Sequence, residues 1–410
     1  MKTIKCSVHG FIQLSPIAVK VIDSCEFQRL KNIKQLGLCH FVYPSALHTR
    51  FEHSIGTYHI ANLMTNAIKN YKFSIDELHA EKRVLSDGEI ECIKLAGLCH
   101  DLGHGPYSHI FDDVFLNKST HPNKTHEVRS CIITEKILQK LIGHSLSDYE
   151  VLTQNHIDLI KQIINPTNER LTLAKESNSQ AIFQIVSNKF TGVDVDKFDY
   201  LNRDCNTLDL GLNFSYQRLI NGIIINEIGD ICYPKKREDD IYRLFYSRYD
   251  MHKNVYNHTT VKCIETMLKD ILNLIDDEIE LSKSIDNMED FCNFNDHTIF
   301  EYIKFNMKKL KQTNIKLVNL YDKLCNRILY KPLMFLSSEE ELNNEYDKLN
   351  ELYPGYFRKV IYGISFCKDI DKVSYYGDDE HKNNVNFNSY NKYLLICIDK
   401  TIKNKLYQSD

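Results

Sequence analysis

The chain has 410 residues, of which 43% are hydrophobic and 26% are charged, and its formal net charge is −4. Ample apolar content with a small net charge excludes a largely disordered protein. The slightly negative net charge excludes a surface that is basic all over, as a general nucleic-acid-binding protein would have. A local basic patch remains compatible with this charge, so nucleic acid stays a possible partner that the sequence does not indicate. Glycine (15) and proline (8) are scarce, which favours long helices, and we predict a mainly α fold.

Helices are predicted where apolar residues recur at helical spacing, over residues 16–36, 51–70, 86–101, 126–140, 178–205 and 238–275. Ser86 and Glu89 match a capping box at the start of one of these helices, and the glycines and proline of residues 102–106 end it. Two isoleucine-rich runs within residues 222–233 flank a glycine-aspartate turn and predict a short β-hairpin.

From about residue 330 the pattern changes. Ser338 and Glu341 predict the start of a helix that the proline and glycine at 354–355 end. Residues 377–392 are rich in asparagine and are predicted as a loop or a disordered segment, and residues 393–398 as a buried strand. We therefore expect a small α/β lobe over residues 331–410, after a large helical unit over residues 1–330.

The expected cellular compartment follows mainly from features that the sequence does not show. Its longest apolar run, residues 393–398, is far shorter than the about 20 residues of a membrane-spanning helix, and no apolar signal segment follows the first charged residues. The 13 cysteines include no CxxC pair, which disfavours a zinc ribbon and fits reduced thiols. We expect a soluble cytoplasmic protein with no membrane partner, and a nuclear location is the alternative.

Histidines are concentrated in one part of the chain. Ten of the 17 lie between His40 and His126, and residues 100–109 hold three of them together with an aspartate. An isolated His-Asp pair is weak evidence, because a histidine near the negative end of a helix is common. His100 and His104 are four residues apart, so a helix would place both on its apolar face, where titratable groups are costly unless they are paired or bind a metal.

Two further segments, residues 50–54 and 192–200, can supply more metal ligands. The candidate set has two imidazoles and two carboxylates: His53, His100, Asp101 and Asp196. Such a set suits iron, manganese, zinc or magnesium and leaves positions for water and a phosphate oxygen. Sequence spacing alone does not bring these residues together.

The order of these motifs resembles a known family. Arg-Phe-Glu-His (50–53), Gly-Leu-Cys-His-Asp-Leu-Gly-His-Gly-Pro-Tyr-Ser-His (97–109), Thr-His-Glu (125–127) and Asp-Val-Asp-Lys-Phe-Asp-Tyr (194–200) are similar to motifs of HD-domain phosphohydrolases. The extended set resembles the SAM- and HD-domain-containing deoxynucleoside triphosphate triphosphohydrolases. The similarity is clear from about residue 2 to 275 and weak beyond; it includes no SAM domain, and we expect the chain to lack one.

The resemblance implies an HD-domain catalytic core over residues 1–330 and a regulatory or oligomerisation lobe over 331–410. It implies hydrolysis of a deoxynucleoside triphosphate (dNTP) to a deoxynucleoside and inorganic triphosphate, through a metal at the four candidate ligands and a water that attacks the α-phosphorus. A second Mg²⁺ would bridge the nucleotide phosphates. His109 would donate a proton to the leaving 5′ oxygen, oriented by Asp112, and His104 and His126 would surround the α-phosphate.

The resemblance also assigns substrate contacts. The triphosphate would be held by Arg50, Lys197, Tyr200 and Arg248, and the sugar 3′-hydroxyl by Gln35 and Asp204. Tyr256 and Leu36 would leave no room for a 2′-hydroxyl, which implies a preference for deoxyribose. Asn257 stands near the base, where the family has a glutamine.

Members of the resembled family are tetramers activated by GTP or dGTP and a dNTP, so a homo-oligomer, dimer or tetramer, is expected. The residues in matching positions for activator binding are Lys2, Asp23, Gln28, Lys31, Arg218 and Lys236. Lys31 replaces an arginine, Ser215 and Thr259 stand where an aspartate and a lysine are expected, and residues 375–395 offer no clear counterpart to a late arginine. We expect the first activator site to be retained and the second to be weakened or absent.

Two alternatives compete with this interpretation. One is an HD-domain hydrolase for another nucleotide, such as a monophosphate, or for a phosphodiester; Arg50, Lys197 and Arg248 favour a triphosphate instead. The other is a catalytically silent nucleic-acid-binding or scaffolding protein, which the net charge and the complete ligand set disfavour. Metal identity and base preference do not follow from the sequence.

Overall fold

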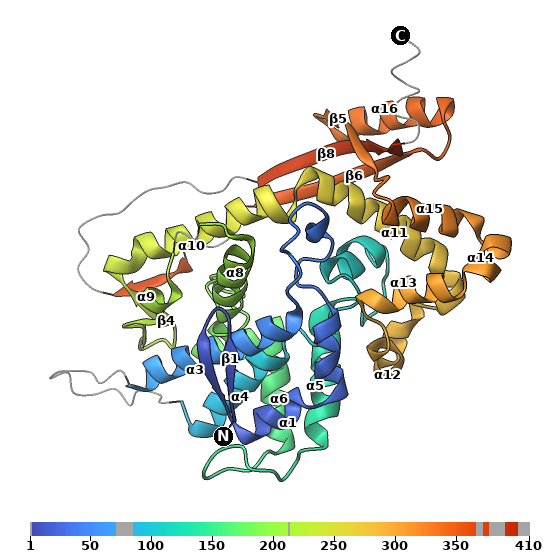
Figure 1. Cartoon of the computed structure of the whole chain (residues 1–410). Helices are drawn as coiled ribbons and strands as arrows, with labels where there is room; N and C mark the ends of the chain where they lie inside the picture. The colour runs from blue at the N-terminus through green and yellow to red at the C-terminus, as the bar shows by residue number, and fades with distance from the viewer. Residues whose placement is uncertain (1, 71–84, 212–213, 366–371, 377–389, 401–410) are drawn as a thin grey trace.

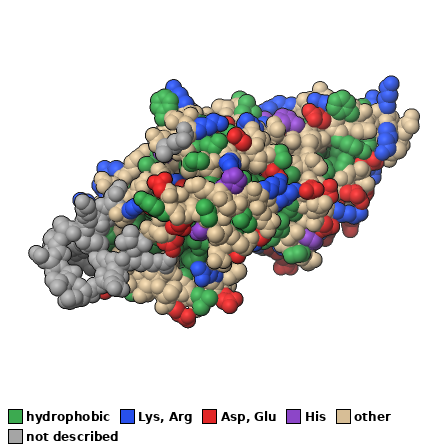
Figure 2. Space-filling model, turned by 90° about the horizontal axis from the view of Figure 1, so that it is seen from below, with side chains coloured by type: hydrophobic (Ala, Val, Ile, Leu, Met, Phe, Trp, Pro, Cys, Tyr) green, Lys and Arg blue, Asp and Glu red, His purple; other side chains and the backbone are tan. Residues whose placement is uncertain are grey.

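The computed structural model describes residues 2–70, 85–211, 214–365, 372–376 and 390–400. The fold is mainly α, as predicted: helices surround one large core, and a small lobe with a sheet lies at one end (Figure 1). Acidic and basic side chains are interspersed over the face shown in Figure 2. Among the described residues, no helix is long and apolar enough to cross a lipid bilayer.

The chain begins with an antiparallel hairpin of β1 (Lys2–Cys6) and β2 (Gly10–Leu14). The sequence did not predict it, because few of its side chains are buried and the alternation is short. The single helix predicted over residues 16–36 is wrong. It is divided into α1 (Pro16–Ile22), α2 (Cys25–Gln28) and the 3-10 helix η1 (Arg29–Asn32), because the Ser24 hydroxyl accepts the Phe27 N–H and starts a new helix.

The next helices agree with prediction. After the 3-10 helix η2 (Cys39–Phe41), α3 spans Arg50–Asn70 and α4 spans Asp87–Cys99, and the capping box at Ser86 and Glu89 is confirmed. Because α4 ends at Cys99, His104 lies beyond it in a loop. The expectation that helical spacing places His100 and His104 on one helix face is therefore wrong, although the loop does return His104 to the same pocket.

The middle of the chain contains a π-helix and further short helices: η3 (Ile110–Phe115), α5 (His126–Gln139), α6 (Gln154–Ile164), α7 (Asn168–Glu176), η4 (Gln180–Gln184), α8 (Val195–Leu208) and α9 (Tyr216–Ile220). The helix predicted over 126–140 is confirmed, whereas one helix over 178–205 is wrong. A loop separates η4 from α8, since Gly192 has a left-handed φ of +73° and the Asp194 carboxylate caps α8 at the Lys197 N–H.

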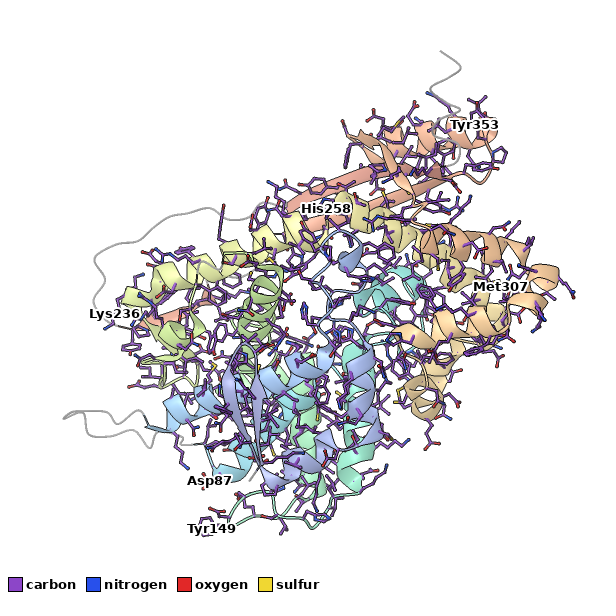
Figure 3. The ribbon with its side chains drawn as sticks, in the orientation of Figure 1. Asp87, Tyr149, Lys236, His258, Met307 and Tyr353 are labelled. Atoms are coloured by element: carbon purple, nitrogen blue, oxygen red, sulfur yellow. The ribbon has the colours of Figure 1, made fainter. Side chains whose placement is uncertain are left out.

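The helix predicted over 238–275 is also interrupted. It consists of α10 (Glu238–Met251), the π-helix η6 (His252–Tyr256) and α11 (Thr259–Ile279). The imidazole of His258, labelled in Figure 3 at the junction, accepts the Thr260 N–H and starts α11. The predicted hairpin is confirmed as β3 (Ile224–Ile225) and β4 (Ile231–Pro234); β7 (Ser374–Tyr376) pairs parallel with β4, which was not predicted.

The described chain continues through η5 (Lys235–Arg237), which precedes α10, and through η7 (Lys283–Asp286), α12 (Met288–Cys292), α13 (Asp296–Phe305), α14 (Met307–Thr313) and α15 (Ile315–Cys325). The C-terminal α/β lobe then consists of β5 (Lys331–Leu336), α16 (Glu339–Leu352), β6 (Phe357–Ser365) and β8 (Tyr390–Ile398). Its antiparallel sheet has the order β5-β8-β6.

Two faces of this sheet pack differently. One face packs with α16 around a small core that includes Phe357 and Ile396, and side chains of the other face, such as Leu395, join the main core. The Ser338 cap and the buried strand are confirmed, and the strand begins earlier than predicted, at Tyr390. Most of the predicted loop, residues 377–389, lies outside the described residues, and the domain boundary at residue 330 stays a prediction.

Candidate active site

The four candidate metal ligands meet at one point. His53 comes from α3, His100 and Asp101 from the end of α4, and Asp196 from the first turn of α8. The Nε2 atoms of the two histidines are 3.3 Å apart, and Asp196 Oδ1 is 3.1 Å from His53 Nε2 and 3.4 Å from His100 Nε2. Each oxygen of Asp101 is 3.4 Å from one of these Nε2 atoms. Three segments far apart in sequence thus converge.

The outer nitrogens of the two imidazoles show that this set fits a metal. His53 Nδ1 is 2.8 Å from Asp199 Oδ2, and His100 Nδ1 is 2.8 Å from the Gly97 carbonyl oxygen. Both partners only accept hydrogen bonds, so each Nδ1 is assigned the proton and each inward Nε2 a lone pair. Two lone pairs and two carboxylates that face one another require a cation between them, and a divalent or transition metal meets that requirement.

The electrostatics of the centre favour positive charge at this point, which a bound metal would supply in place of a proton on His53 Nε2. Burial opposes a charged His53, but the carboxylates of Asp196, Asp199 and Asp101 outweigh burial and raise its pKa to about 10. Burial likewise opposes the Asp101 carboxylate, yet Arg50 and His100 hold its pKa well below the usual range. The carboxylates are therefore ionised at neutral pH, and a bound metal takes the place of protons.

A buried network behind the metal centre holds His53 in place. Asp199, which accepts from His53 Nδ1, also accepts two hydrogen bonds of 2.9 Å from Arg203. His9, in the turn of the N-terminal hairpin, reaches the other side of the same carboxylate, and its Nδ1 is 2.9 Å from the Tyr216 hydroxyl. Sequence reasoning missed these roles: Asp199 and Arg203 are four residues apart on α8, but nothing in the sequence connects His9 to them.

Replacement of Asp199 by asparagine is expected to weaken metal binding by about 10- to 100-fold, because His53 loses the acceptor that orients its ring. Metal content after dialysis against a weak chelator measures this, with circular dichroism to establish that the variant is folded. Unchanged metal retention in a folded Asp199→Asn variant would contradict the prediction.

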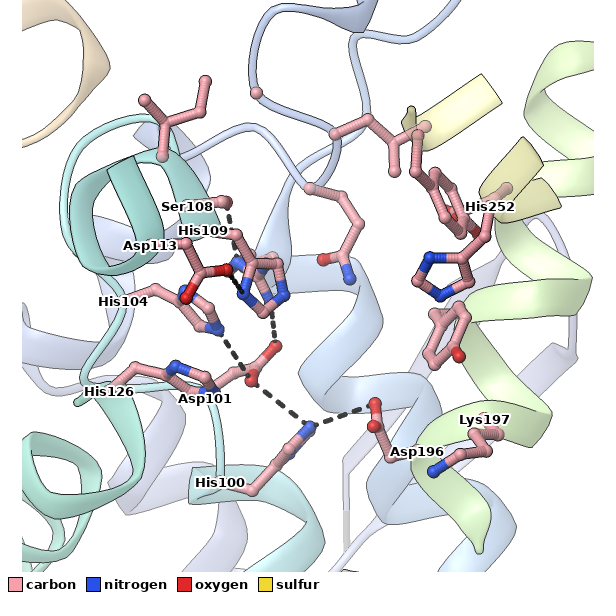
Figure 4. Close-up of a pocket in the computed structure, with 18 of the residues that line it drawn as sticks. His100, Asp101, His104, Ser108, His109, Asp113, His126, Asp196, Lys197 and His252 are labelled. Carbon is pink, nitrogen blue, oxygen red and sulfur yellow. Dashed lines mark hydrogen bonds and ion pairs between the residues drawn. The ribbon is translucent and has the colours of Figure 1, made fainter. Parts of the chain in front are cut away.

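Three more histidines line the pocket beside the metal centre (Figure 4). The rings of His104 and His126 are stacked at 3.9 Å, and His109 lies edge-on to both at 4.9 and 5.3 Å. The resemblance implies that Asp112 orients His109. In the structure Asp112 instead accepts from His126, at its N–H (2.8 Å) and Nδ1 (2.9 Å), and the acid beside His109 is Asp113, at 3.8 Å.

The surroundings shift the pKa values of these three histidines in different directions. Burial and the charges of Arg50 and His126 hold the pKa of His104 well below its ordinary value. The pKa of His109 is lowered as well, although much of its side chain is open to the pocket. Burial also opposes a charged His126, but Asp112 and Glu127 outweigh it and raise its pKa. Of the three imidazoles, His126 is therefore the one whose surroundings favour the charged, doubly protonated form.

The pair of His126 and Asp112 predicts a pH-dependent stability difference. The pKa of His126 is raised by folding, so the pair stabilises the folded state below the ordinary histidine pKa of about 6.5, and the contribution is lost as pH rises through the folded pKa. A glutamine cannot take this proton. We therefore expect the free energy of unfolding lost in His126→Gln to be larger at pH 6 than at pH 9, measured by urea denaturation; an equal loss at both pH values would contradict it.

The metal centre opens into a pocket of about 450 Å³, a volume in the range of small-molecule sites. The structure places every predicted substrate residue on its wall: Gln35, Leu36, Arg50, Lys197, Tyr200, Asp204, Arg248, Tyr256 and Asn257. Tyr200 and Asp204 follow Asp196 at one-turn intervals on α8. Figure 4 shows His109 and His252 on opposite sides of the opening.

Comparison with known proteins places the chain in a family. The model of the HD domain matches residues 50–188. An HD domain-containing protein of Acanthamoeba polyphaga mimivirus is 46% identical over 347 residues, which cover 81% of this chain and 73% of that protein. The chain belongs to the HD-domain family.

Two further relatives carry an activity in their names. Deoxynucleoside triphosphate triphosphohydrolase SAMHD1 of Homo sapiens is 35% identical over 333 residues (76% of this chain, 52% of the relative). The SAMHD1 homolog of Dictyostelium discoideum is 32% identical over 332 residues (80% of this chain, 59% of the relative). The chain thus spans little more than half the length of these two relatives.

Several wall residues of this HD-domain protein were not predicted. His252 lies between Arg248 and Tyr256 at four-residue intervals, so helical spacing could have identified it. Lys262 and Glu265, which form a 2.8 Å ion pair, also line the pocket and carried no sequence signal.

Internal contacts orient the polar wall residues. Asp204 accepts from the Tyr256 hydroxyl (2.6 Å) and lies 2.7 Å from His48 Nε2, so both of its oxygens are engaged. Arg248 donates to the Ser365 carbonyl (3.1 Å) at the end of β6, which links a predicted phosphate contact to the C-terminal lobe.

The predicted activator residues form two separate groups. One group lies on the N-terminal hairpin and on the segment from α1 to η1, and its members are Lys2, Asp23, Gln28 and Lys31. Within this group, Lys31 Nζ donates to Gln28 Oε1 at 2.6 Å. Arg218 and Lys236 lie around α9 and η5; Arg218 pairs with Asp240 and Lys236 is exposed. In the shared orientation of Figures 1 and 3, the N-terminus and Lys236 lie apart. One copy of the chain does not bring the two groups together.

Proposed function

We propose that the protein hydrolyses deoxynucleoside triphosphates to the deoxynucleoside and inorganic triphosphate. The observation that carries the proposal is that the candidate metal ligands adjoin a pocket lined by Arg50, Lys197 and Arg248. Three cationic side chains that line one pocket fit a chain of phosphates better than a single phosphate, which disfavours a nucleoside monophosphate. The names of two relatives, at 35% and 32% identity, support the same substrate class.

When bound, the metal supplies Lewis-acid polarisation of the phosphoryl group and a lowered pKa of water. Arg50 is buried and preorganised for phosphate: Nε donates to the Ser108 hydroxyl at 2.8 Å and Nη1 pairs with Asp101. Lys197, whose Nζ is 2.9 Å from Asp194, stays charged, because Asp194 outweighs the effect of burial and raises its pKa. A second Mg²⁺ on the phosphates would be brought in by the nucleotide.

Proton transfer is assigned to the histidine group. His109 is the proposed donor to the leaving 5′ oxygen and is neutral before substrate binds; the negative phosphates would raise its pKa. Asp112 and Glu127 favour the charged form of His126, which would offset negative charge at the α-phosphate. The deoxyribose would lie against Tyr256 and Leu36, and its 3′-hydroxyl near Gln35, whose buried Oε1 has no hydrogen-bond partner among the described residues.

The test is a product assay on each of the four dNTPs, with inorganic triphosphate separated from pyrophosphate and phosphate by ion-exchange chromatography. We expect equal amounts of deoxynucleoside and triphosphate from at least one dNTP in the presence of added metal. Release of pyrophosphate or phosphate instead, or hydrolysis confined to a monophosphate or phosphodiester, would refute the proposal.

We also propose that activation by GTP or dGTP requires a second copy of the chain, since the two activator groups lie apart on one copy. The C-terminal lobe and the hairpin would contribute to this homo-oligomer, with the first activator site retained and the second weakened. Sedimentation and hydrolysis of dATP, each with and without GTP, test this. A strict requirement for both GTP and a second dNTP would contradict the weakened second site.

A further inference from the structure

The histidine loop, residues 100–109, contains two consecutive residues with an unusual backbone conformation. Tyr107 and Ser108 have φ values of +63° and +61°, the left-handed region that residues other than glycine seldom occupy. A strained pair persists only where the surrounding structure fixes it, and such pairs cluster at functional sites. Ser108 lies directly before His109, so whatever fixes this pair also fixes the start of that histidine.

The group that fixes the pair is Asp296, the first residue of α13. Its carboxylate is almost fully buried and uses each oxygen on a different loop. The Tyr107 N–H donates to Oδ1 (2.6 Å), and the Lys34 N–H donates to Oδ2 (2.9 Å). The Tyr107 hydroxyl also donates to the Asp296 carbonyl (2.9 Å), so the tyrosine is held at both ends.

The second of these loops carries residues of the pocket wall. Lys34 directly precedes Gln35 and Leu36, which face the pocket. The Ser108 hydroxyl connects the two loops a second time, because it donates to the Lys34 carbonyl (2.7 Å) and accepts from Arg50 Nε (2.8 Å). One hydroxyl thus joins the backbone of residue 34 to the side chain of Arg50 at the left-handed turn.

We propose that Asp296 is a positioning residue that fixes residues 33–37 against residues 104–109. Through this connection it sets the distance between the side chains proposed to recognise the sugar and those proposed to act on the α-phosphate. The inference rests on the proposed function. Asp296 touches no candidate metal ligand, so its effect is on substrate placement and sugar selection and not on metal binding.

Replacement of Asp296 by asparagine tests the proposal. The amide has the same shape but one acceptor oxygen, and its NH₂ group would face one of the two backbone N–H groups. We expect kcat/KM for dATP to fall by about 10- to 100-fold, since small displacements of positioning groups have effects of this size. The ratio of kcat/KM for dATP to that for ATP should fall as well, with metal content unchanged. The exposed Asp322 on α15 supplies the matched control, Asp322→Asn.

Ser108→Ala removes the second connection without a change in α13. It should alter the dATP to ATP ratio in the same direction, and the double variant should lose less than the sum of the two losses, because both act through one unit. Hydrogen–deuterium exchange adds a readout that needs no activity: Asp296→Asn should speed exchange in residues 33–37 and 104–109 and leave α4 unchanged.

A folded Asp296→Asn variant with wild-type exchange in both loops and a wild-type dATP to ATP ratio would overturn the proposal. Additive losses in the double variant, or loss of metal in step with activity, would also overturn it. If Asp296→Asn does not fold, an unchanged ratio of kcat/KM for dATP to that for ATP in Ser108→Ala would also overturn the proposal. A wild-type protein that releases no triphosphate refutes the proposed function instead, while the exchange experiment still decides the role of Asp296.

Discussion

Replacement of Asp101 by alanine is expected to abolish triphosphate release, with kcat reduced by at least about 10³-fold, since metal polarisation of a phosphoryl group supplies several kcal/mol and about 1.4 kcal/mol is a factor of ten. Asp101 lies against both imidazoles of the metal set and pairs with Arg50. Its loss therefore removes a candidate metal ligand and leaves a buried guanidinium without this partner, which disturbs the phosphate site too.

The measurement is single-turnover release of inorganic triphosphate, together with metal content by mass spectrometry. His100→Ala should behave in the same way, because it removes an inward lone pair from the same point. The exposed Asp322→Ala should retain activity and metal. If Asp101→Ala and His100→Ala both release product at the wild-type rate, the metal mechanism is wrong.

Substitution of lysine for Arg50 is expected to lower kcat/KM by about 10²-fold although the charge is kept, because an ammonium cannot reproduce a planar fork of donors. The guanidinium joins Ser108, Asp101 and the open pocket at the same time. A lysine could reach one of these partners, so the triphosphate would lose an oriented donor and the histidine loop would lose its contact with α3.

Steady-state kinetics on the preferred dNTP measures this, with Arg243→Lys on the exposed side of α10 as the matched control. Thermal unfolding separates the catalytic effect from a change in stability. A wild-type kcat/KM in a folded Arg50→Lys variant would show that charge alone is enough, and it would remove the geometric role assigned to the guanidinium.

The sequence predicted more of the site than of the helix boundaries. Every residue proposed for substrate contact lies on one pocket wall, and the four candidate ligands converge. Chemistry at a site limits which residue types can occupy it, so the pattern is visible in one sequence. Helix interruptions at Ser24, Asp194 and His258 were missed because each depends on a side chain that caps a new helix within a continuous apolar periodicity.

Contacts between distant segments were not visible in the sequence. Asp296 reaches Lys34, 262 residues away, and Tyr107, 189 residues away, and His9 reaches Asp199 from the first hairpin. The pairing of Asp112 with His126, 14 residues away, in place of His109 was not visible in the sequence either. A carboxylate accepts from whichever donor the fold brings within about 3 Å, and spacing along the chain does not determine that donor.

The sequence by itself determined a helical chain with a concentrated set of histidines and aspartates in the order of the HD-domain motifs, because side-chain chemistry and periodicity are local properties. The tertiary structure decided which nitrogen of each imidazole faces inward, which of the three pocket histidines has its pKa raised, and which buried carboxylate contacts the Tyr107–Ser108 turn. Those outcomes depend on burial and on partners brought from other segments, since both the cost of a buried charge and its compensation arise only after the chain has folded.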